Sequence, residues 1–269
     1  MHLKRWITAM VALPFLIFLI YKGGIAFAGL VGVACVFALC EYFRIVFNPK
    51  GGTLSGFILL IALTLGLVTI WAAYENAPDI ILCVLAFNLM LSGFFSLTQF
   101  KSDAFILENI TKQIQGMTYI PLLLSFLVLI RNSSDGMAWI FFLLCIVFAG
   151  DVGAYYVGSY RGRHKLCPSV SPGKTIEGSV GGLAANVLIG SVFKLLFFPM
   201  FPWGISILFF LGIGVSGQVG DLFESEFKRF SGVKDSGVIL PGHGGILDRI
   251  DALLFAAPLA YFFKTYLFV

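Results

Sequence analysis

The sequence predicts an all-α, polytopic integral membrane protein with about nine transmembrane helices. Of its 269 residues, 59% are hydrophobic and only 12% are charged, whereas a soluble domain carries roughly 25% charged residues. Phenylalanine alone fills 29 positions. The apolar residues come in long blocks without the alternation of a barrel strand, so membrane-spanning helices are favoured over a β-barrel.

A spanning helix needs roughly 20 mostly apolar residues, and nine segments approach or reach that length. They run over about 6–21, 24–40, 54–73, 80–99, 114–130, 137–160, 176–197, 203–222 and 245–268. The first is short, contains Pro14 and follows Lys4 and Arg5. It therefore also resembles a signal peptide, although a polytopic chain needs no separate signal.

No repeat and no soluble domain is evident in the chain. We therefore expect residues 1–269 to form a single membrane domain. Its N-terminal helices would occupy about 1–130, and the helices and loops of the candidate site about 137–269.

Lysine and arginine are distributed unevenly along this pattern of helices. If the N-terminus is cytoplasmic, 14 of the 18 basic residues fall on the cytoplasmic side, as the positive-inside rule requires. The loops 161–175 and 223–244 then lie on that side, and both are long, basic and rich in glycine. Such loops on a rigid scaffold often carry function. The net charge of +4 is small, and no nucleic-acid partner is predicted.

Four aspartates fall within or beside the apolar segments, where each costs about 2.5–3.5 kcal/mol on insertion scales. The predicted topology places Asp151, Asp221, Asp248 and Asp251 at the cytoplasmic ends of their helices. Asp248 and Asp251 are three residues apart and share a helix face. If the eighth helix continues past its apolar run, Asp221 and Ser225 share a face in the same way.

Hard oxygen ligands of this kind suit Mg²⁺, and the nearby Lys228, Arg229, Lys234 and Arg249 suit phosphate groups. Simpler interpretations remain open. An aspartate at a helix start stabilises the helix dipole, and Asp151 is equally explained by a structural ion pair. For His243, between glycines, a role in the turn is favoured over metal ligation.

The other basic loop contains the triplet Gly173-Lys174-Thr175. It is not a P-loop, because Pro168 occupies the position of the first glycine and no strand is expected before it. Ser171, Lys174 and Thr175 precede the seventh predicted helix, whose N-terminal amides favour anions. Ordinary helix capping by Ser or Thr explains the same spacing equally well.

Two stretches resemble a known family. "SEFKRFSGVKDSGVILPGHGGILDRID", from Ser225 to Asp251, resembles the signature of phosphatidate cytidylyltransferases, also called CDP-diacylglycerol synthases, at every fixed position. "GDVGAYYVGSYRGRHKLCPSVSPGKTIEGSVGG" resembles a second conserved region of that family, although Gly173 stands where lysine is common. The first 130 residues are similar only in being apolar and helical.

The resemblance implies a reaction in which CTP and phosphatidate give CDP-diacylglycerol and pyrophosphate. It implies Mg²⁺ as the cofactor, with the number of metal ions left open. It also implies a homodimeric enzyme of the bacterial inner membrane whose lipid substrate stays in the bilayer. The residues that it makes candidates fall into three groups. These are Asp221, Ser225, Asp248 and Asp251 for the metal; Lys228 and Arg229 for phosphates; and Ser171, Lys174, Thr175, Glu177, Lys234 and Arg249 for the nucleotide.

The main alternative is a cation- or proton-coupled transporter, because intramembrane carboxylates also mark ion pathways. Against it, the acidic residues gather on one side, and no corresponding interrupted segments appear in two halves. A CDP-alcohol phosphotransferase is disfavoured because "DRIDALLFA" lacks the glycine and arginine of that family's motif.

Overall fold

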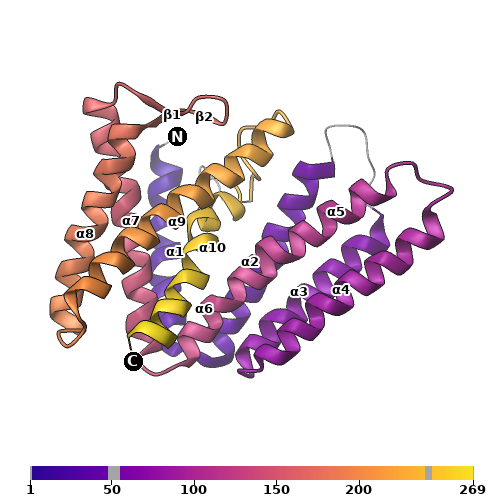
Figure 1. Cartoon of the computed structure of the whole chain (residues 1–269), viewed down its shortest axis with the longest axis horizontal. Coiled ribbons are helices and arrows are strands. Elements are labelled where there is room, and N and C mark those ends of the chain that lie inside the picture. The colour runs from indigo at the N-terminus through magenta and orange to yellow at the C-terminus, as the bar shows by residue number, and fades with distance from the viewer. Residues whose placement is uncertain (1, 48–54, 240–243, 269) are drawn as a thin grey trace. The chain divides into compact units, whose positions relative to one another are not determined.

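The computed structural model describes residues 2–47, 55–239 and 244–268 (Figure 1). Over these residues the chain is almost entirely helical. The helices are α1 (His2–Lys22), α2 (Gly24–Phe47), α3 (Gly56–Tyr74), α4 (Pro78–Gln99), α5 (Ile106–Met117), α6 (Leu123–Asn132), α7 (Gly136–Arg161), α8 (Ile176–Phe197), α9 (Trp203–Phe230) and α10 (Leu247–Phe262). Two π-helical turns, η2 (Thr118–Leu122) and η3 (Phe263–Leu267), join or extend them, and two short strands are β1 (Lys165–Cys167) and β2 (Ser171–Thr175).

The all-α polytopic fold is confirmed, because a helix occupies each of the nine predicted segments. Within the described part of the chain, eight helical segments are long and apolar enough to cross a membrane. The first predicted segment is the exception: α1 contains Pro14, and its apolar part, Ala12–Lys22, is shorter than a span. The predicted count was therefore close, with one helix too short.

The fifth span starts earlier than predicted. Residues 100–113 were assigned to a loop, but α5 begins at Ile106. Its first turns bury Ile110 and Gln113 and carry a half-buried Glu108–Lys112 ion pair of 2.9 Å. Such an amphipathic start is too polar to count as an apolar run. Pro121 lies in η2, where α5 passes into α6, as expected for a residue that cannot donate a helical hydrogen bond.

The hairpin β1–β2 also differs from the sequence analysis, which expected no strand before Lys174. The two strands pair antiparallel, with Lys165 opposite Thr175 and Cys167 opposite Ser171. The Gly-Lys-Thr triplet itself lies in β2. The hairpin connects α7 to α8 (Figure 1).

Contacts divide the chain into two compact units, which are described separately. Unit 1 comprises Met1–Asn132 and Phe227–Arg249, and unit 2 comprises Ser133–Glu226 and Ile250–Val269. The predicted single membrane domain, with N-terminal helices over about 1–130 and catalytic helices and loops over about 137–269, stays a prediction.

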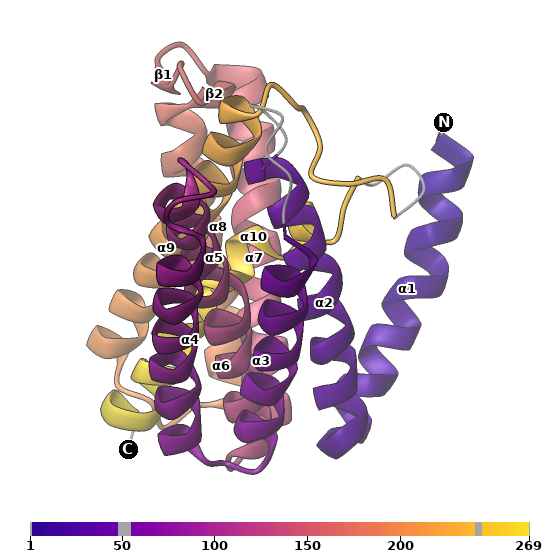
Figure 2. The same ribbon diagram turned by 90° about the vertical axis from the view of Figure 1, so that its right-hand side faces the viewer.

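Polar contacts join the helices of unit 1. In its interior, Gln113 of α5 donates to Asn88 of α4 at 2.6 Å and accepts from Ser92 at 2.8 Å. Near the end of α6, Arg131 donates to the carbonyl of Ile20 at 2.7 Å and so caps the C-terminus of α1. Figure 2 shows α2, α3, α4 and α5 side by side.

In unit 2, helices α7 and α8 pack along their whole length, because small residues allow a close approach. A Cβ added at Gly181 would lie 2.5 Å from Cβ of Val157 on α7. Towards one end of the unit, Trp139, Phe142, Phe193, Phe198, Phe201, Phe209 and Phe268 form an aromatic cluster. This cluster accounts for part of the high phenylalanine content.

The Gly181 contact gives a first prediction. Gly181→Ala is expected to lower the melting temperature of the purified protein, because overpacking a tight contact costs about 1–3 kcal/mol. The β-branched Val157 side chain cannot swing aside. Gly204→Ala on α9 is the matched control, since a Cβ there meets nothing within 4 Å. Equal melting temperatures of the two variants in detergent would contradict the expected clash.

Candidate active site

Unit 2 contains a cavity of about 490 Å³ between the hairpin and helices α7, α8 and α9. Its volume lies in the range of small-molecule sites. Its polar lining combines two carboxylates, one lysine, hydroxyl groups and an amide: Asp151, Tyr155, Ser159, Ser171, Lys174, Thr175, Ser179, Gln218 and Asp221. The cavity therefore brings together Ser171, Lys174, Thr175 and Asp221, four of the candidates from the sequence. Asp151, whose role was left open, also lines it.

An ion pair crosses this cavity. Lys174 Nζ of β2 lies 2.6 Å from Oδ2 of Asp221 on α9. The Nζ atom is buried and has no well-directed hydrogen bond to any described residue. It therefore keeps donors that an anionic ligand could use.

Helices α9 and α10 approach each other closely beside Asp221. A Cβ added at Gly220 would lie 2.5 Å from the carbonyl oxygen of Asp251, and Phe223 packs against Phe255 with ring centroids 5.5 Å apart. Only glycine allows this approach. The backbone next to Asp221 therefore lies against the backbone of Asp251.

Helix α9 runs without a break to Phe230. Asp221 and Ser225 therefore lie on one continuous helix, as a shared face requires. Ser225 Oγ lies 3.4 Å from Oδ1 of Asp221, one turn earlier. On α10, Asp251 Oδ1 accepts the backbone N–H of Ala252 at 2.8 Å.

The hairpin is anchored by Glu177 of α8. Its carboxylate accepts the backbone N–H of Arg163 at 3.0 Å and contacts Nδ1 of His164 at 2.6 Å. Glu177 therefore holds the chain where α7 leads into β1. In the structure, Glu177 thus stabilises the start of the hairpin. A direct contact between Glu177 and the nucleotide stays a prediction.

Thr175 caps α8. Its side-chain oxygen accepts the backbone N–H of Gly178 at 3.1 Å, so the capping interpretation is confirmed for this residue. Ser171 lies at the start of β2, half-buried.

This cap gives a second prediction. Thr175→Ala is expected to destabilise the protein by about 0.5–2 kcal/mol, because α8 loses its N-cap hydrogen bond. Thr175→Ser keeps the oxygen and should unfold near the wild-type temperature. Thermal unfolding in detergent measures both. If alanine and serine behave alike, the methyl group of Thr175 matters and the cap does not.

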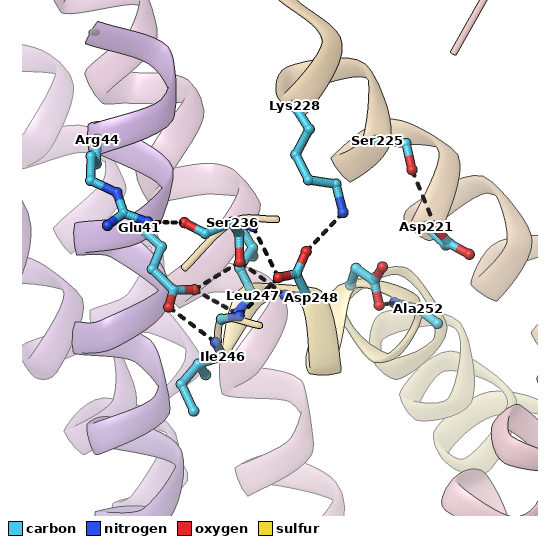
Figure 3. Close-up of polar contacts among 12 residues, drawn as sticks. Glu41, Arg44, Asp221, Ser225, Lys228, Ser236, Ile246, Leu247, Asp248 and Ala252 are labelled. Atoms are coloured by element: carbon cyan, nitrogen blue, oxygen red, sulfur yellow. Dashed lines mark hydrogen bonds and ion pairs between the residues drawn. The ribbon is translucent and has the colours of Figure 1, made fainter. Parts of the chain in front are cut away.

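In unit 1, Asp248 at the start of α10 is surrounded by donors (Figure 3). Its Oδ1 accepts from Lys228 Nζ at 2.8 Å. Its Oδ2 accepts the backbone N–H of Ser236 at 2.9 Å and that of Gly245 at 2.8 Å. Asp248 is thus both a capping residue and the partner of a candidate phosphate-binding lysine.

Glu41 of α2 is a residue that the sequence analysis missed. It is 3% exposed and accepts hydrogen bonds from Ser236, Ile246 and Leu247. A signal was available, because Glu41 stands in the apolar run "FALCEYFRIVF", where a carboxylate is as costly as the aspartates that were singled out.

Three basic candidates and His243 are still to be placed. Arg229, Lys234 and Arg249 are exposed in unit 1, and His243 lies outside the described residues. Within the described ranges, no three of the histidine, cysteine, aspartate and glutamate side chains gather as a group that could hold a metal ion. The metal assignment of Asp221, Ser225, Asp248 and Asp251 therefore stays a prediction.

Comparison with known proteins decides the family. The model of the cytidylyltransferase family matches residues 3–267. The chain belongs to this family. It is similar to the phosphatidate cytidylyltransferase of Bacillus subtilis (strain 168), with 34% identity over 96% of each chain.

Two further relatives of the same family carry the same name. The protein of Staphylococcus epidermidis is 34% identical over 95% of this chain and 96% of its own length. That of Staphylococcus aureus (strain COL) is 35% identical over the same shares. The resemblance seen in two stretches thus extends along the whole chain, including the first 130 residues. Neither the family nor these names support the transporter alternative.

Proposed function

We propose that this membrane protein transfers the cytidylyl group of CTP to phosphatidate, giving CDP-diacylglycerol and pyrophosphate for phospholipid biosynthesis. The observation that carries the proposal is the end-to-end match to relatives named phosphatidate cytidylyltransferase. The cavity around Lys174 and Asp221 supports it, because a mostly apolar cavity that also holds charged side chains suits one water-soluble and one lipid substrate.

The reaction needs little acid–base chemistry from the chain. A phosphate oxygen of phosphatidate, already anionic at neutral pH, attacks the α-phosphorus of CTP. The bond from that phosphorus to the oxygen bridging to the β-phosphate breaks, and pyrophosphate leaves. The difficulty is the approach of two anions, so positioning and charge neutralisation dominate, as in other phosphoryl transfers. Lys174, with its buried Nζ, would contact CTP phosphates, and Lys228 would hold phosphate beside Asp248.

Mg²⁺ is the metal that we propose, with a second metal ion left open. Oxygen donors suit it, and it is usually held by one or two carboxylates together with substrate phosphates. Asp221 and Ser225 offer such donors one turn apart on α9, and Asp248 and Asp251 do so on α10. When bound, the ion would neutralise the charge that develops on the phosphates.

The cellular setting is proposed on the same basis. The excess of lysine and arginine on one side supports a cytoplasmic N-terminus and a site on the cytoplasmic side, where CTP is available. The family resemblance and the bacterial origin of the relatives support the inner (cytoplasmic) membrane. A homodimer is proposed from the family resemblance, and light scattering of the detergent-solubilised protein would test it.

The experiment that tests the reaction follows cytidine label. The purified protein receives phosphatidate and CTP labelled in the cytidine, with and without Mg²⁺. We expect label in the organic phase only when Mg²⁺ and phosphatidate are both present, matched by pyrophosphate release. No transfer by folded protein, with several divalent metals and lipids, would overturn the proposal.

A further inference from the structure

Glu41 lies near the end of α2, in unit 1, and its carboxylate is enclosed by donors from a distant segment (Figure 3). Oε2 accepts from Ser236 Oγ at 3.0 Å and from the backbone N–H of Leu247 at 2.9 Å. Oε1 accepts the backbone N–H of Ile246 at 3.1 Å. Both oxygens therefore act as acceptors, in contacts that span about 200 positions of the sequence.

A buried carboxylate is costly unless hydrogen bonds satisfy it. Here two backbone amides and one hydroxyl do so. The backbone also comes unusually close, because a Cβ at Gly237 would lie 2.1 Å from Oε1 and one at Gly245 2.4 Å from Oε2. The two glycines are explained by this approach, so the segment around Asp248 is shaped to fit Glu41.

Ser236 links Glu41 to Asp248. The same hydroxyl that donates to Glu41 accepts the backbone N–H of Asp248 at 3.3 Å. The backbone N–H of Ser236 in turn donates to Oδ2 of Asp248 at 2.9 Å. Glu41 therefore fixes the residue that orients the Asp248 carboxylate.

Two neighbours on α2 hold the same segment. The guanidinium of Arg44 donates to the carbonyl of Ser236, and Ser231 Oγ donates to the carbonyl of Ile45 at 2.5 Å. The end of α2 thus acts as a fixed support for Ser231, Ser236, Ile246 and Leu247. Glu41 is its only carboxylate among the described residues 41–47.

We propose that Glu41 is a positioning residue: through Ser236 and the amides of Ile246 and Leu247, it holds the Asp248 carboxylate in the orientation that the reaction uses. The inference rests on the proposed function. Glu41 contacts no substrate in this scheme. It acts on catalysis by keeping Asp248 aligned with Lys228.

Glu41→Gln tests the proposal, because an amide keeps the shape of the side chain but replaces one acceptor by a donor. Whichever way the amide turns, it faces a backbone N–H. Loss of a hydrogen bond that orients a site residue from behind typically costs about 10–100-fold in activity. We expect that loss in kcat, with KM for CTP little changed. Tyr42→Phe is the control: Tyr42 is fully buried on the same helix, but its hydroxyl contacts Lys112 and Gln115.

A double-mutant cycle separates positioning from general destabilisation. If Glu41 acts through Asp248, adding Glu41→Gln to Asp248→Asn should reduce the residual activity further by less than about twofold. Independent, multiplicative losses would overturn the proposal. Ser236→Ala removes only the hydroxyl link and should lower kcat in the same direction, which keeps the test available if Glu41→Gln does not fold.

Hydrogen exchange gives a readout that does not depend on the reaction. In Glu41→Gln, the amides of Ile246 and Leu247 should exchange faster than in the wild type, whereas Tyr42→Phe should leave them unchanged. Unchanged exchange in Glu41→Gln would overturn the positioning role. If the wild type transfers no cytidylyl group but exchange rises as expected, the proposed function fails and the anchoring contact stands.

Discussion

Replacing Asp248 with asparagine is expected to lower turnover on the order of 100-fold or more, with the protein still folded and inserted. The Asp248 carboxylate accepts from Lys228 Nζ at 2.8 Å on one oxygen and from two backbone amides on the other. Asparagine can still accept from the amides, but its NH₂ group would then face the lysine. The variant therefore loses the negative charge and the ion pair. Cytidine label entering the lipid phase measures turnover, and gel filtration reports folding.

The structure also supplies the control for this variant. Asp248 helps to cap α10, so a loss of activity could reflect capping alone. Asp103 is a half-buried aspartate in the same unit, and its carboxylate accepts the backbone N–H of Phe105 at 2.8 Å, just before α5. Asp103→Asn removes a comparable charge far along the chain from the signature, and it should retain activity. Full activity of Asp248→Asn would mean that Asp248 serves only as a cap.

The membrane helices could be predicted because their signal is local. Each span is a run of apolar residues, and hydropathy needs no knowledge of the partner helix. The features that were missed depend on partners elsewhere in the chain. The amphipathic start of α5 is helical because Ile106 and Ile110 pack inside unit 1. Pro172 and Gly173 are poor strand residues, so β2 has little strand propensity of its own. It is a strand because its backbone pairs with β1, a partner that local propensity does not reveal.

The site shows the same limit. Spacing along the chain singled out Lys174, Asp221, Lys228 and Asp248 as candidates, but it could not say which side chains meet. In the structure, Lys228 of α9 pairs with Asp248 of α10, and Lys174 of β2 pairs with Asp221 of α9. Glu41 escaped notice because its amide partner Leu247 is 206 positions away. A lone acidic residue in an apolar run was the only hint.

Replacing Lys174 with glutamine is expected to raise KM for CTP by roughly tenfold or more, which corresponds to about 1.4 kcal/mol of lost binding. Lys174 lines the cavity of unit 2. Its buried Nζ lies 2.6 Å from Asp221 Oδ2 and makes no well-directed hydrogen bond to a described residue. The phosphates of a nucleoside triphosphate in that cavity would need a cation to offset their charge, and glutamine supplies none. Steady-state kinetics with varied CTP and fixed phosphatidate would measure the change.

Lys165 provides the matched control on the same hairpin. It is exposed on β1, and its Nζ donates to the carbonyl of Pro172 at 2.7 Å. Lys165→Gln removes the same charge without entering the cavity, so its KM for CTP should stay near the wild-type value. Lys174→Arg keeps the charge and should fall between wild type and Lys174→Gln. Equal KM values for Lys165→Gln and Lys174→Gln would show that CTP binding depends on the overall charge of the hairpin. The cavity would then lose its assignment as the nucleotide site.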